Sequence, residues 1–512
     1  MQQTITPRKM NDIEHIYMES HSIPSLLLME LAAQGIVRAM HTLVSSHASC
    51  LFLCGPGNNG GDGYAAARLW QDQGGKAMIF ELSAVPSTRE AQINRNLCLE
   101  RSIPVTSDPG SLSLSTFSLI VDAFYGTGFH GILDDSSRQI FSSTAHCRIP
   151  ILCVDIPSGL NGESGAASPD TPRAVMTVTF HAVKQGLLLN QGPRHTGRIV
   201  VSPIQMLPVL DDEAMDILFP CDLSHLIPSR DPLSHKGSFG RIILYCGSLG
   251  MVGAAAMAAR AALKCGAGLV TFLCSSSIVP ILQTLVPEAM CVSLEAEGEN
   301  WSSASLLRAK HLLETADCVI AGCGLGRNAI HLPVLEHIHS LPCPVIWDAD
   351  AICLLADHPC LLPLRSCDFI TPHPGEAGRL LGCTAEWIVQ NSLHALDALQ
   401  AKVQCSVILK GARSLMISGE RRAINAFSSP VLARGGSGDM LCGILAACSV
   451  RLRTSEAASL SVMQSACLIH GLAGMRAAWR FGEDSASPQD ILSCLRMDAE
   501  DLPPVLPLTA RL

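Results

Sequence analysis

Short apolar runs that end in a glycine or an acidic residue recur along the whole 512-residue chain. Segments with apolar residues at helical spacing lie between these runs, so strand-like and helix-like segments alternate. A chain with this pattern forms parallel sheets, because each crossover between neighbouring strands lays a helix over the sheet. The alternation therefore predicts an α/β fold in which open, mostly parallel sheets carry helices on both faces.

The alternation is interrupted over residues 206–232, where prolines and acids break the apolar pattern. A chain of this length is too long for one ordinary hydrophobic core, and domain boundaries fall in such irregular segments. We therefore predict two domains, covering residues 1–215 and 222–505.

The composition excludes several classes of protein. With 48% hydrophobic and 16% charged residues the chain is globular, and its net charge of −9 gives no basic surface for nucleic acid. The 22 cysteines show neither C-x-x-C nor paired Cys/His spacing, which favours reduced core thiols in a cytoplasmic protein over zinc ligands. Neither a signal peptide nor an uninterrupted apolar run of membrane length is present in the sequence, so we expect no membrane insertion.

Three apolar runs in the first half end in an oxygen-bearing side chain close to glycines. Asn59, Asp122 and Ser158 follow these runs, and a predicted glycine loop over residues 56–63 contains the first of them. Open α/β sheets bind ligands at the carboxyl ends of their strands, and these oxygens suit a hard cation better than zinc. Each residue alone is more typical of a loop cap, but three at equivalent strand ends predict a site. Lys184, after a later strand, is consistent with an ordinary surface lysine.

The second half contains a glycine loop at residues 433–439, Ala-Arg-Gly-Gly-Ser-Gly-Asp, followed by an apolar helix. A helix N-terminus offers free N–H groups and the positive end of the helix dipole, which favour an anion such as phosphate. Asp439 lies at that position, where it is able to accept a proton from a substrate hydroxyl. The alternative is that Asp439 only caps the helix.

Other predicted strand ends of the second half carry further polar residues. Asp348 and Asp350 would point to opposite faces if their strand continued through them, which argues against a catalytic pair. His373 precedes Pro-Gly-Glu and is consistent with a helix cap. Lys410 follows a buried run and suits either a phosphate contact or a lysine that reaches solvent.

Taken in order, these motifs resemble a known family. PSLLLMELAAQG, CGPGNNGGDGY, VDAFYGTG, VDIPSG and TVTFHAVKQGLL resemble an NAD(P)H-hydrate epimerase domain. HKGSFGR, GCGLG, WDADAI, TPHPGEAGRLLG, ILKGA and GGSGD resemble an ADP-dependent NAD(P)H-hydrate dehydratase domain. The two in this order, over about residues 5–500, resemble the bifunctional NAD(P)H-hydrate repair enzymes.

The resemblance implies a Rossmann-like N-terminal domain and a ribokinase-like C-terminal domain. The first would interconvert the R and S epimers of hydrated NADH and NADPH (NADHX and NADPHX) with bound K⁺. The second would phosphorylate the hydroxyl of the S epimer with ADP and Mg²⁺ and then eliminate phosphate, giving NAD(P)H, AMP and phosphate. The family resemblance also implies a homo-oligomer in the cytoplasm.

The resemblance assigns site residues as well. Asp155, Lys184 and Asp439 would be catalytic, and Asn59, Asp122 and Ser158 would hold K⁺. The hydrate would contact, in the first domain, Asn58, Asn59, Gly60, Gly61, Asp62, Gly126, Thr127, Gly128, Phe129, His130, Gly131, Ile132 and Asp155. In the second domain it would contact Ala254, Gly326, His373 and Asp439. The nucleotide would contact Lys410, Gly411, Ala412, Arg413, Ser414 and Gly438.

The chain departs from the family pattern at Ser428-Ser429-Pro430, at Arg434 and at Phe129-His130-Gly131. Arg434 is expected to add a positive charge beside the phosphates. An alternative function is that of a small-metabolite kinase of ribokinase-like type, with a non-catalytic nucleotide-binding module at its N-terminus.

Overall fold

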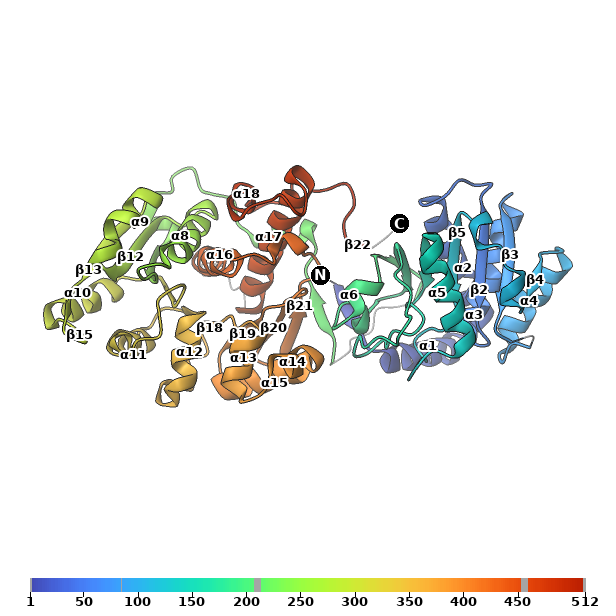
Figure 1. The fold of residues 1–512 in the computed structure, drawn as a ribbon, viewed down its shortest axis with the longest axis horizontal. Coiled ribbons are helices and arrows are strands. Elements are labelled where there is room, and N and C mark those ends of the chain that lie inside the picture. Colours follow the sequence, from blue (N-terminus) through green and yellow to red (C-terminus); the bar gives the residue numbers. More distant parts are fainter. Residues whose placement is uncertain (1, 84, 207–212, 453–458, 510–512) are drawn as a thin grey trace. The chain divides into compact units, whose positions relative to one another are not determined.

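The computed structural model describes residues 2–83, 85–206, 213–452 and 459–509. The chain divides into two compact units. The N-terminal unit consists of Gln2–Met215 together with Val505–Leu512, and the C-terminal unit consists of Asp216–Pro504. The strand β10 (Met215–Ile217) lies where the chain passes from the first unit to the second. In each unit helices cover the strands of a sheet (Figure 1).

The N-terminal unit contains, within its described residues, a sheet of eight parallel strands. In spatial order these are β22 (Leu508–Thr509), β9 (Arg198–Ser202), β7 (Met176–Phe180), β6 (Ile151–Val154), β5 (Leu119–Ala123), β2 (Ser49–Cys54), β3 (Lys76–Glu81) and β4 (Val105–Thr106). The helices are α1 (Pro7–His21), α2 (Ser25–His41), α3 (Asn58–Asp72), α4 (Arg89–Glu100), α5 (Asp135–Cys147) and α6 (Gly192–His195). A short pair, β1 (Gln2–Ile5) and β8 (Val183–Lys184), is also parallel.

The sheet of the N-terminal unit is buried on both faces because the residues of each strand alternate between them. In β2, Cys50, Phe52 and Cys54 join one core cluster, whereas Leu51 and Leu53 join another. The first cluster contains buried residues of α2 and α3, and the second contains buried residues of α5. The strand therefore carries a continuous apolar run, as the sequence predicts.

The sheet of the C-terminal unit is parallel except at one end. In spatial order it runs β13 (Met290–Leu294), β12 (Leu269–Ser275), β11 (Arg241–Tyr245), β16 (Cys318–Ala321), β17 (Val345–Trp347), β18 (Phe369–Ile370), β19 (Ser406–Leu409), β20 (Leu415–Ser418) and β21 (Arg421–Ile424). The pairs β19–β20 and β20–β21 are antiparallel. A separate short hairpin joins β14 (Ala296–Glu297) to β15 (Asn300–Trp301).

The helices of the C-terminal unit complete its layers. They are α7 (Leu223–Leu226), α8 (Val252–Lys264), α9 (Val279–Leu285), α10 (Ser303–Leu313), α11 (Leu332–His339), α12 (Asp350–Asp357), α13 (Pro374–Leu381), α14 (Ala385–Gln390), α15 (Ser392–Val403), α16 (Ser437–Leu452), α17 (Ser459–Phe481) and α18 (Pro488–Ser493). Helix α16 approaches α8 closely, since a Cβ on Gly443 would lie 2.1 Å from the carbonyl oxygen of Ala258. Glycine at this position lets α16 lie against α8, which fixes the beginning of α16 over the sheet.

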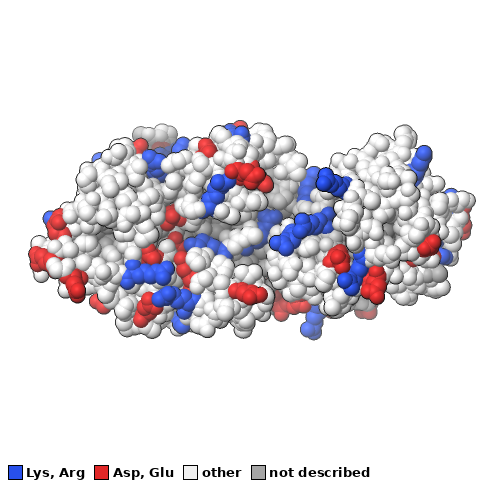
Figure 2. Space-filling model, viewed as in Figure 1, with Lys and Arg blue, Asp and Glu red and all other residues white. Residues whose placement is uncertain are grey.

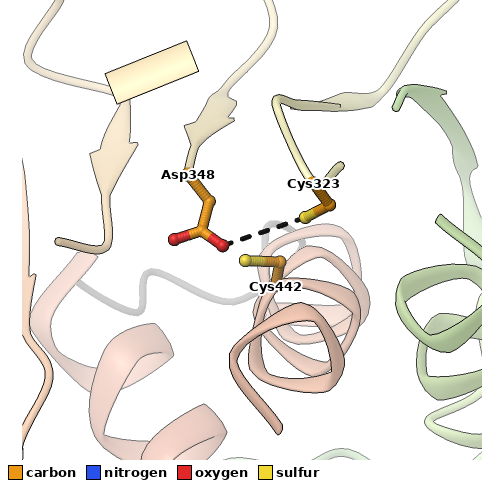
Figure 3. Close-up of side chains that lie close together, drawn as sticks. All are labelled: Cys323, Asp348 and Cys442. Atoms are coloured by element: carbon orange, nitrogen blue, oxygen red, sulfur yellow. Dashed lines mark hydrogen bonds between the residues drawn. The ribbon is translucent and has the colours of Figure 1, made fainter. Parts of the chain in front are cut away.

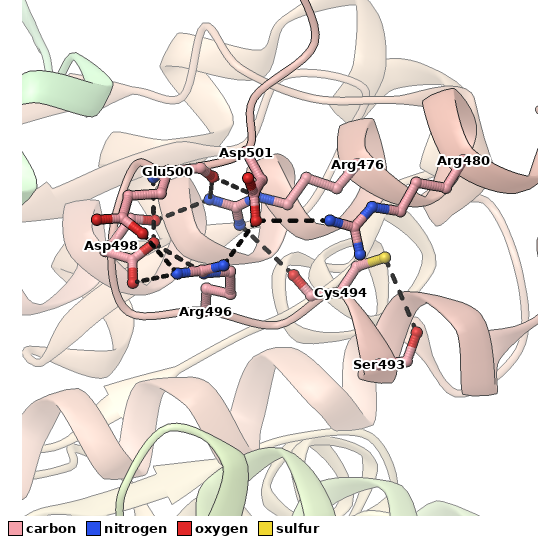
Figure 4. A network of polar contacts seen from close by, with 8 residues as sticks. All are labelled: Arg476, Arg480, Ser493, Cys494, Arg496, Asp498, Glu500 and Asp501. Carbon is pink, nitrogen blue, oxygen red and sulfur yellow. Dashed lines mark hydrogen bonds and ion pairs between the residues drawn. The ribbon is translucent and has the colours of Figure 1, made fainter.

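One fully buried arginine holds the segment that follows α18. The guanidinium of Arg476 donates to the carbonyl oxygens of Asp498 and Glu500, both at 2.8 Å (Figure 4). Arg496 forms ion pairs with the side chains around it, including Asp498 at 2.9 Å. These contacts fix the chain just before it returns to the N-terminal unit as β22.

The exposed surface carries charges of both signs. On the face drawn in Figure 2, acidic and basic side chains are interspersed among wide uncharged areas. Across the described ranges, none of the helices has the length and apolar character that crossing a membrane requires.

Candidate active sites

The polar residues of the N-terminal unit meet because their strands are neighbours. Strands β2, β5 and β6 lie side by side and parallel, so their carboxyl ends share one edge of the sheet. The predicted glycine loop ends earlier than expected, since α3 already begins at Asn58 and includes Gly63. A Cβ on Gly60 would lie 1.9 Å from the carbonyl oxygen of Gly55, so the first turn of the helix packs directly on the strand end. Residues 58–62 are therefore presented by a helix N-terminus and not by a loop.

Asp122 and Ser158 form the centre of this edge. Asp122 is fully buried and accepts hydrogen bonds from the backbone N–H of Ser158 at 2.9 Å and from its hydroxyl at 2.6 Å. Burial is the largest effect on the Asp122 carboxyl and raises its pKa. The amide nitrogen of Asn59 is buried without a hydrogen-bond partner among the described residues. A Cβ on Gly126 would lie 3.1 Å from the side chain of Asn59, so the loop after β5 closes over the same point.

Asp155 and Lys184 form a buried ion pair beside this cluster. The Lys184 ammonium, 1% exposed, lies 2.6 Å from Asp155 Oδ1 and donates to the carbonyl oxygen of Phe180 at 2.8 Å. Thr179 also donates to Asp155 Oδ1, at 3.0 Å. The prediction of an ordinary surface lysine was wrong, because the ion pair and the carbonyl replace the water that a lysine head normally requires.

Two further acids belong to the same neighbourhood. Burial raises the pKa of Asp62 well above its usual value, and the charges of Asp155 and Glu14 raise it further. Burial also raises the pKa of Glu14, while Lys184 lowers it. The carboxyl groups of Glu14, Asp62 and Asp155 thus have a single lysine near them, Lys184. This excess of acidic groups favours the protonated form of at least one of them. The sequence analysis missed Glu14, which lies on α1 among charged and polar residues that give it no local signal.

The rest of the predicted loop after β5 is open to solvent. Gly128, His130 and Gly131 are exposed, and the Ile132 side chain is 70% exposed. The Phe129 ring lies 5.3 Å from the ring of Tyr125. The structure therefore places Gly126 against Asn59, while Gly128 and residues 130–132 are exposed.

In the C-terminal unit, Asp439 lies in the first turn of α16, directly after the glycine loop. Burial and, less strongly, the charge of Asp348 raise the pKa of Asp439 to about 6, while a hydrogen bond from Cys323 and the charge of Lys410 act in the opposite direction. Behind the loop, Ser437 Oγ lies 3.1 Å from Nε2 of the buried His470. Burial lowers the pKa of His470 to about 4, so this histidine is neutral near pH 7. Asp439 is thus largely ionised near pH 7 but basic enough to take up a proton.

Lys410 and Asp348 extend this site across the ends of three neighbouring strands. Lys410 Nζ, after β19, lies 2.6 Å from Asp348 Oδ1, which follows β17. Thr371, after β18, donates its hydroxyl to the same oxygen at 2.6 Å. The Lys410 side chain is only 18% exposed, so it does not simply reach into solvent. A Cβ on Gly438 would lie 3.3 Å from Lys410 Nζ, which places the ammonium at the beginning of α16.

The other predicted contacts of this unit lie at neighbouring strand ends. His373 caps α13 by accepting the N–H of Gly375 at 3.0 Å, and its Nε2 lies 3.3 Å from Glu376. The capping role foreseen for His373 is therefore present, while its side chain stays half-exposed. Gly326, after β16, donates its N–H to Asp350 at 2.9 Å. Asp348 and Asp350 thus bind different partners, but the assumed continuation of the strand through them is wrong, because β17 ends at Trp347 and α12 begins at Asp350.

Ala254 lies at the beginning of α8, next to the glycine turn that follows β16. A Cβ on Gly324 would lie 3.0 Å from the Cβ of Ala254. The nucleotide-binding residues predicted after Lys410 form a turn in which Gly411 and Ala412 are exposed and Arg413 and Ser414 are half-buried. Arg413 donates to the carbonyl oxygen of Ala426.

Arg434 does not extend along the glycine loop. Its guanidinium donates to the carbonyl oxygens of Glu483 at 3.2 Å and Asp484 at 2.7 Å. These carbonyls hold it on the loop that follows α17. The charge expected beside the phosphates is therefore directed elsewhere.

Comparison with known proteins gives two family matches that together cover most of the chain. A family profile described as NAD(P)H-hydrate dehydratase matches residues 242–496. A second profile, described as YjeF-related protein N-terminus, matches residues 25–186. The two matches fall in different structural units.

Full-length relatives carry both parts. The bifunctional NAD(P)H-hydrate repair enzyme Nnr of Coxiella burnetii is 32% identical over 96% of this chain and 98% of its own length. The enzyme of the same name from Escherichia coli strain K12 is 34% identical over 95% of this chain and 92% of its own length. Among solved structures, a ribokinase-like superfamily protein of Enterococcus faecalis is 26% identical, covers 56% of this chain and 96% of its own, and has a TM-score of 0.49. The identity and coverage of the full-length relatives place this chain in the family of bifunctional NAD(P)H-hydrate repair enzymes.

Proposed function

We propose that this chain restores hydrated NADH and NADPH in two reactions, with an epimerase in the N-terminal unit and an ADP-dependent dehydratase in the C-terminal unit. The observation that carries the proposal is the placement of Asp439. Its carboxylate lies at the beginning of α16 beside Lys410, where a base and a phosphate-binding site are needed together. Membership of the family over nearly the full chain supports the same pair of reactions.

In the proposed dehydration, Asp439 takes the proton of the substrate hydroxyl. The hydroxyl oxygen then attacks the terminal phosphoryl group of ADP, and AMP leaves. The phosphate then leaves with the electrons of the C–O bond, and the neighbouring carbon loses a proton to it, which restores the double bond. The N–H groups at the beginning of α16 and the Lys410 ammonium stabilise the negative charge that passes through the phosphoryl group. Ala254, Gly326 and His373 would border the hydrate, and residues 410–414 with Gly438 would border the nucleotide.

Mg²⁺ fits this site through hard oxygen ligands. The carboxylates of Asp348 and Glu376 flank Lys410, with Nζ distances of 2.6 Å and 3.9 Å. Mg²⁺ prefers carboxylate and phosphate oxygens and keeps several waters, so these two acids would hold it against the nucleotide phosphates. When bound, it would neutralise phosphate charge during the transfer.

In the proposed epimerisation, Asp155 exchanges a proton with the substrate and Lys184 holds its carboxylate in place. The distance of 2.6 Å and the positive φ of 62° at Asp155 fix the orientation of the carboxylate. Residues 58–62 and the loop from Gly126 to Ile132 would enclose the substrate.

The cluster of Asn59, Asp122 and Ser158 fits K⁺. Asp122 is a buried carboxylate with no ion pair among the described residues, and it is surrounded by hydroxyl and amide groups. A monovalent cation would balance its charge, whereas zinc would require sulfur or nitrogen ligands. Bound there, K⁺ would polarise substrate oxygens at the strand ends.

The cytoplasmic location and the homo-oligomeric state stay predictions. The finding that all 22 cysteines are free thiols supports a reducing compartment. The alternative of a small-metabolite kinase with a non-catalytic N-terminal module receives no support from the full-length relatives, which are bifunctional repair enzymes.

The test uses a mixture of R and S hydrated NADH with the full-length protein, K⁺ and Mg²⁺. With ADP, we expect complete recovery of the reduced-nicotinamide absorbance, faster than a protein-free control in which the epimers interconvert slowly. Recovery that stops at the S fraction would contradict the epimerase. No recovery with ADP, together with accumulation of a phosphorylated product with ATP, would favour the kinase instead.

A further inference from the structure

Two buried cysteines and an aspartate converge at the edge of the proposed dehydratase site. The sulfurs of Cys323 and Cys442 and a carboxylate oxygen of Asp348 all lie within 4.8 Å of one another. Figure 3 shows the carboxylate and the two sulfurs pointing toward a common centre. This is the one group of three such ligand atoms found within the described residues.

We propose that Cys323, Asp348 and Cys442 form a binding site for a thiophilic divalent cation of the zinc class, and that its occupancy stops dehydration. The binding part of the proposal stands on this geometry alone, while the inhibitory part rests on the proposed function. The sequence does not predict such a site, because the three residues lie far apart in the chain and show no zinc-like spacing.

The positions of the three ligands are set by rigid elements. Cys323 follows β16, Asp348 follows the neighbouring β17, and Cys442 lies in the second turn of α16. Cys323 Sγ already lies 3.9 Å from Asp348 Oδ2. Ligand atoms around a tetrahedral zinc ion are roughly 3.5–3.8 Å apart, given Zn–S and Zn–O bonds of about 2.3 Å and 2.1 Å. Small rotations of the side chains are therefore enough to complete three positions of such a site, with the fourth left for water.

The two carboxylate oxygens of Asp348 have different neighbours. Oδ1 of Asp348 receives hydrogen bonds from Lys410 and Thr371, both at 2.6 Å. Oδ2 faces the thiols. An ion on Oδ2 therefore does not need to displace the Lys410 ammonium.

The charges of an occupied site balance. Binding releases one proton from each thiol, so two thiolates, one carboxylate, one ammonium and a divalent cation sum to zero. The pKa of both thiols lies well above the usual value, mainly because of a hydrogen bond to a neighbouring sulfur (Cys246 for Cys323, and Cys323 for Cys442), and burial raises it further. Sulfur ligands select zinc-class ions over Mg²⁺, so this site differs in ion preference from the one proposed for the nucleotide metal, although both include Asp348.

An ion at this position would interfere with the dehydratase site through two neighbours. Cys442 lies about one helical turn after Asp439 on α16, so the ion would lie close to the proposed base. The ion would also bind the carboxylate of Asp348, which is one of the two acids proposed for the nucleotide metal, and would therefore compete with Mg²⁺ for it.

The experiment titrates the full-length, metal-free protein with Cd²⁺ alone and records the thiolate-to-cadmium charge-transfer absorbance. Other cysteines of this chain also bind cadmium, so the readout is the difference between variants. We expect Cys323→Ala and Cys442→Ala each to lose one tight equivalent that the wild type has, with affinity lowered by more than about 100-fold. Cys448→Ala is the matched control, because Cys448 is equally buried and lies on the same helix as Cys442. Zn²⁺ should displace the ion from this equivalent.

Two results would overturn the site: equal binding by Cys442→Ala and wild type, or the same loss in Cys448→Ala. If an alanine variant does not fold, the serine variant, which keeps the side-chain size but supplies no thiolate, takes its place. Zinc-edge anomalous scattering from wild-type crystals tests the site without any variant, and zinc only at other positions would refute it. Because these readouts need no substrate, they do not depend on the dehydratase assignment. The inhibitory part fails if Zn²⁺ occupies the site while ADP-dependent dehydration continues undiminished.

Discussion

Lys410 Nζ lies 2.6 Å from Asp348 Oδ1, although 62 positions separate the two residues in the sequence. The pair ties the carboxyl ends of β17 and β19 together and holds the ammonium at the beginning of α16. The same carboxylate raises the pKa of Asp439. One ion pair therefore positions the proposed phosphate contact and also tunes the proposed base.

Replacing the proposed base should separate activity from stability. We expect Asp439→Asn to lower ADP-dependent dehydration by about 10²–10⁴-fold, since general-base catalysis has that magnitude. The same change removes a half-buried charge close to Asp348, so the melting temperature should rise by a few degrees. Thermal unfolding and the rate with the S epimer, measured on the same preparation, check both. A variant that is more stable and fully active would rule out Asp439 as the base.

The rate of dehydration should depend on pH through Asp439. The pKa of this group is about 6, and the base acts only when it has lost its proton. Activity should therefore be complete above about pH 7, half-maximal near pH 6 and fall about tenfold for each further pH unit. The kcat of the S epimer, measured between pH 5 and 8 with circular dichroism to confirm folding, tests this. A profile that is flat down to pH 5 would contradict the assignment.

Replacing Lys410 alone should destabilise the protein more than replacing both Lys410 and Asp348. Lys410→Met leaves a carboxylate that is 2% exposed without its partner, which costs roughly 3 kcal/mol and lowers the melting temperature by about 6–12 °C. Lys410→Met/Asp348→Asn should recover much of this loss. Calorimetry should show weaker ADP binding by both variants, because both lack the ammonium. Equal melting temperatures of the single and double variants would show that the pair is not coupled.

The two reactions should respond separately to changes at Asp155. Asp155→Asn should reduce epimerisation by about 10²–10⁴-fold while dehydration of the S epimer continues. Asparagine tolerates the positive φ of 62° at this position, so the backbone should not change. Asp170→Asn is the matched control, because Asp170 has a similar φ of 66° and pairs with Arg138 at 3.0 Å on the surface. Recovery of the R epimer in the presence of ADP measures the effect, and equal loss in both variants would remove Asp155 from the mechanism.

Epimerisation should require K⁺ through Asp122. We expect at least about a tenfold higher rate in K⁺ than in Li⁺, since the buried carboxylate otherwise lacks a cation. The Asp122→Asn variant should epimerise at the same rate in K⁺ as in Li⁺. Asp134→Asn, which alters a cap of α5 after the same strand, should keep the higher rate in K⁺. The assay compares the two salts at equal ionic strength, and the same rate in both with the wild type would exclude a specific K⁺ site.

The α/β class with mostly parallel sheets is confirmed by the strand pairing, because alternating strands and helices leave few other topologies. The sequence also placed Asn59, Asp122 and Ser158 at neighbouring strand ends, since parallel strands share one edge. The prediction of a glycine loop that continues past Asn58 is wrong, because α3 already begins there. A glycine in a sequence is consistent either with a flexible loop or with a helix that packs closely against another segment. Here the glycines allow the first turn of α3 to pack closely on the end of β2.

Residues that reach a site only through tertiary packing were not predictable from local patterns. Glu14 lies on a helix upstream of the first domain motifs, and Cys323 and Cys442 resemble ordinary core cysteines in the sequence. Lys184 was interpreted as exposed because no single segment reveals that Asp155 lies opposite. Each case depends on side chains that separate elements bring together.

The strand β22 gives the two units an interdependence during synthesis. Its backbone pairs with β9, and the carbonyl of Pro507 accepts the N–H of Ile199 at 2.8 Å. The N-terminal unit is therefore interrupted by the whole C-terminal unit and is complete only after β22 has been synthesised. A chain that stops earlier in translation leaves β9 as an open sheet edge, which is a template for aggregation and a target for quality control. A chain that ends directly before β22 would consequently contain the whole C-terminal unit but would lack the closing strand of the N-terminal unit.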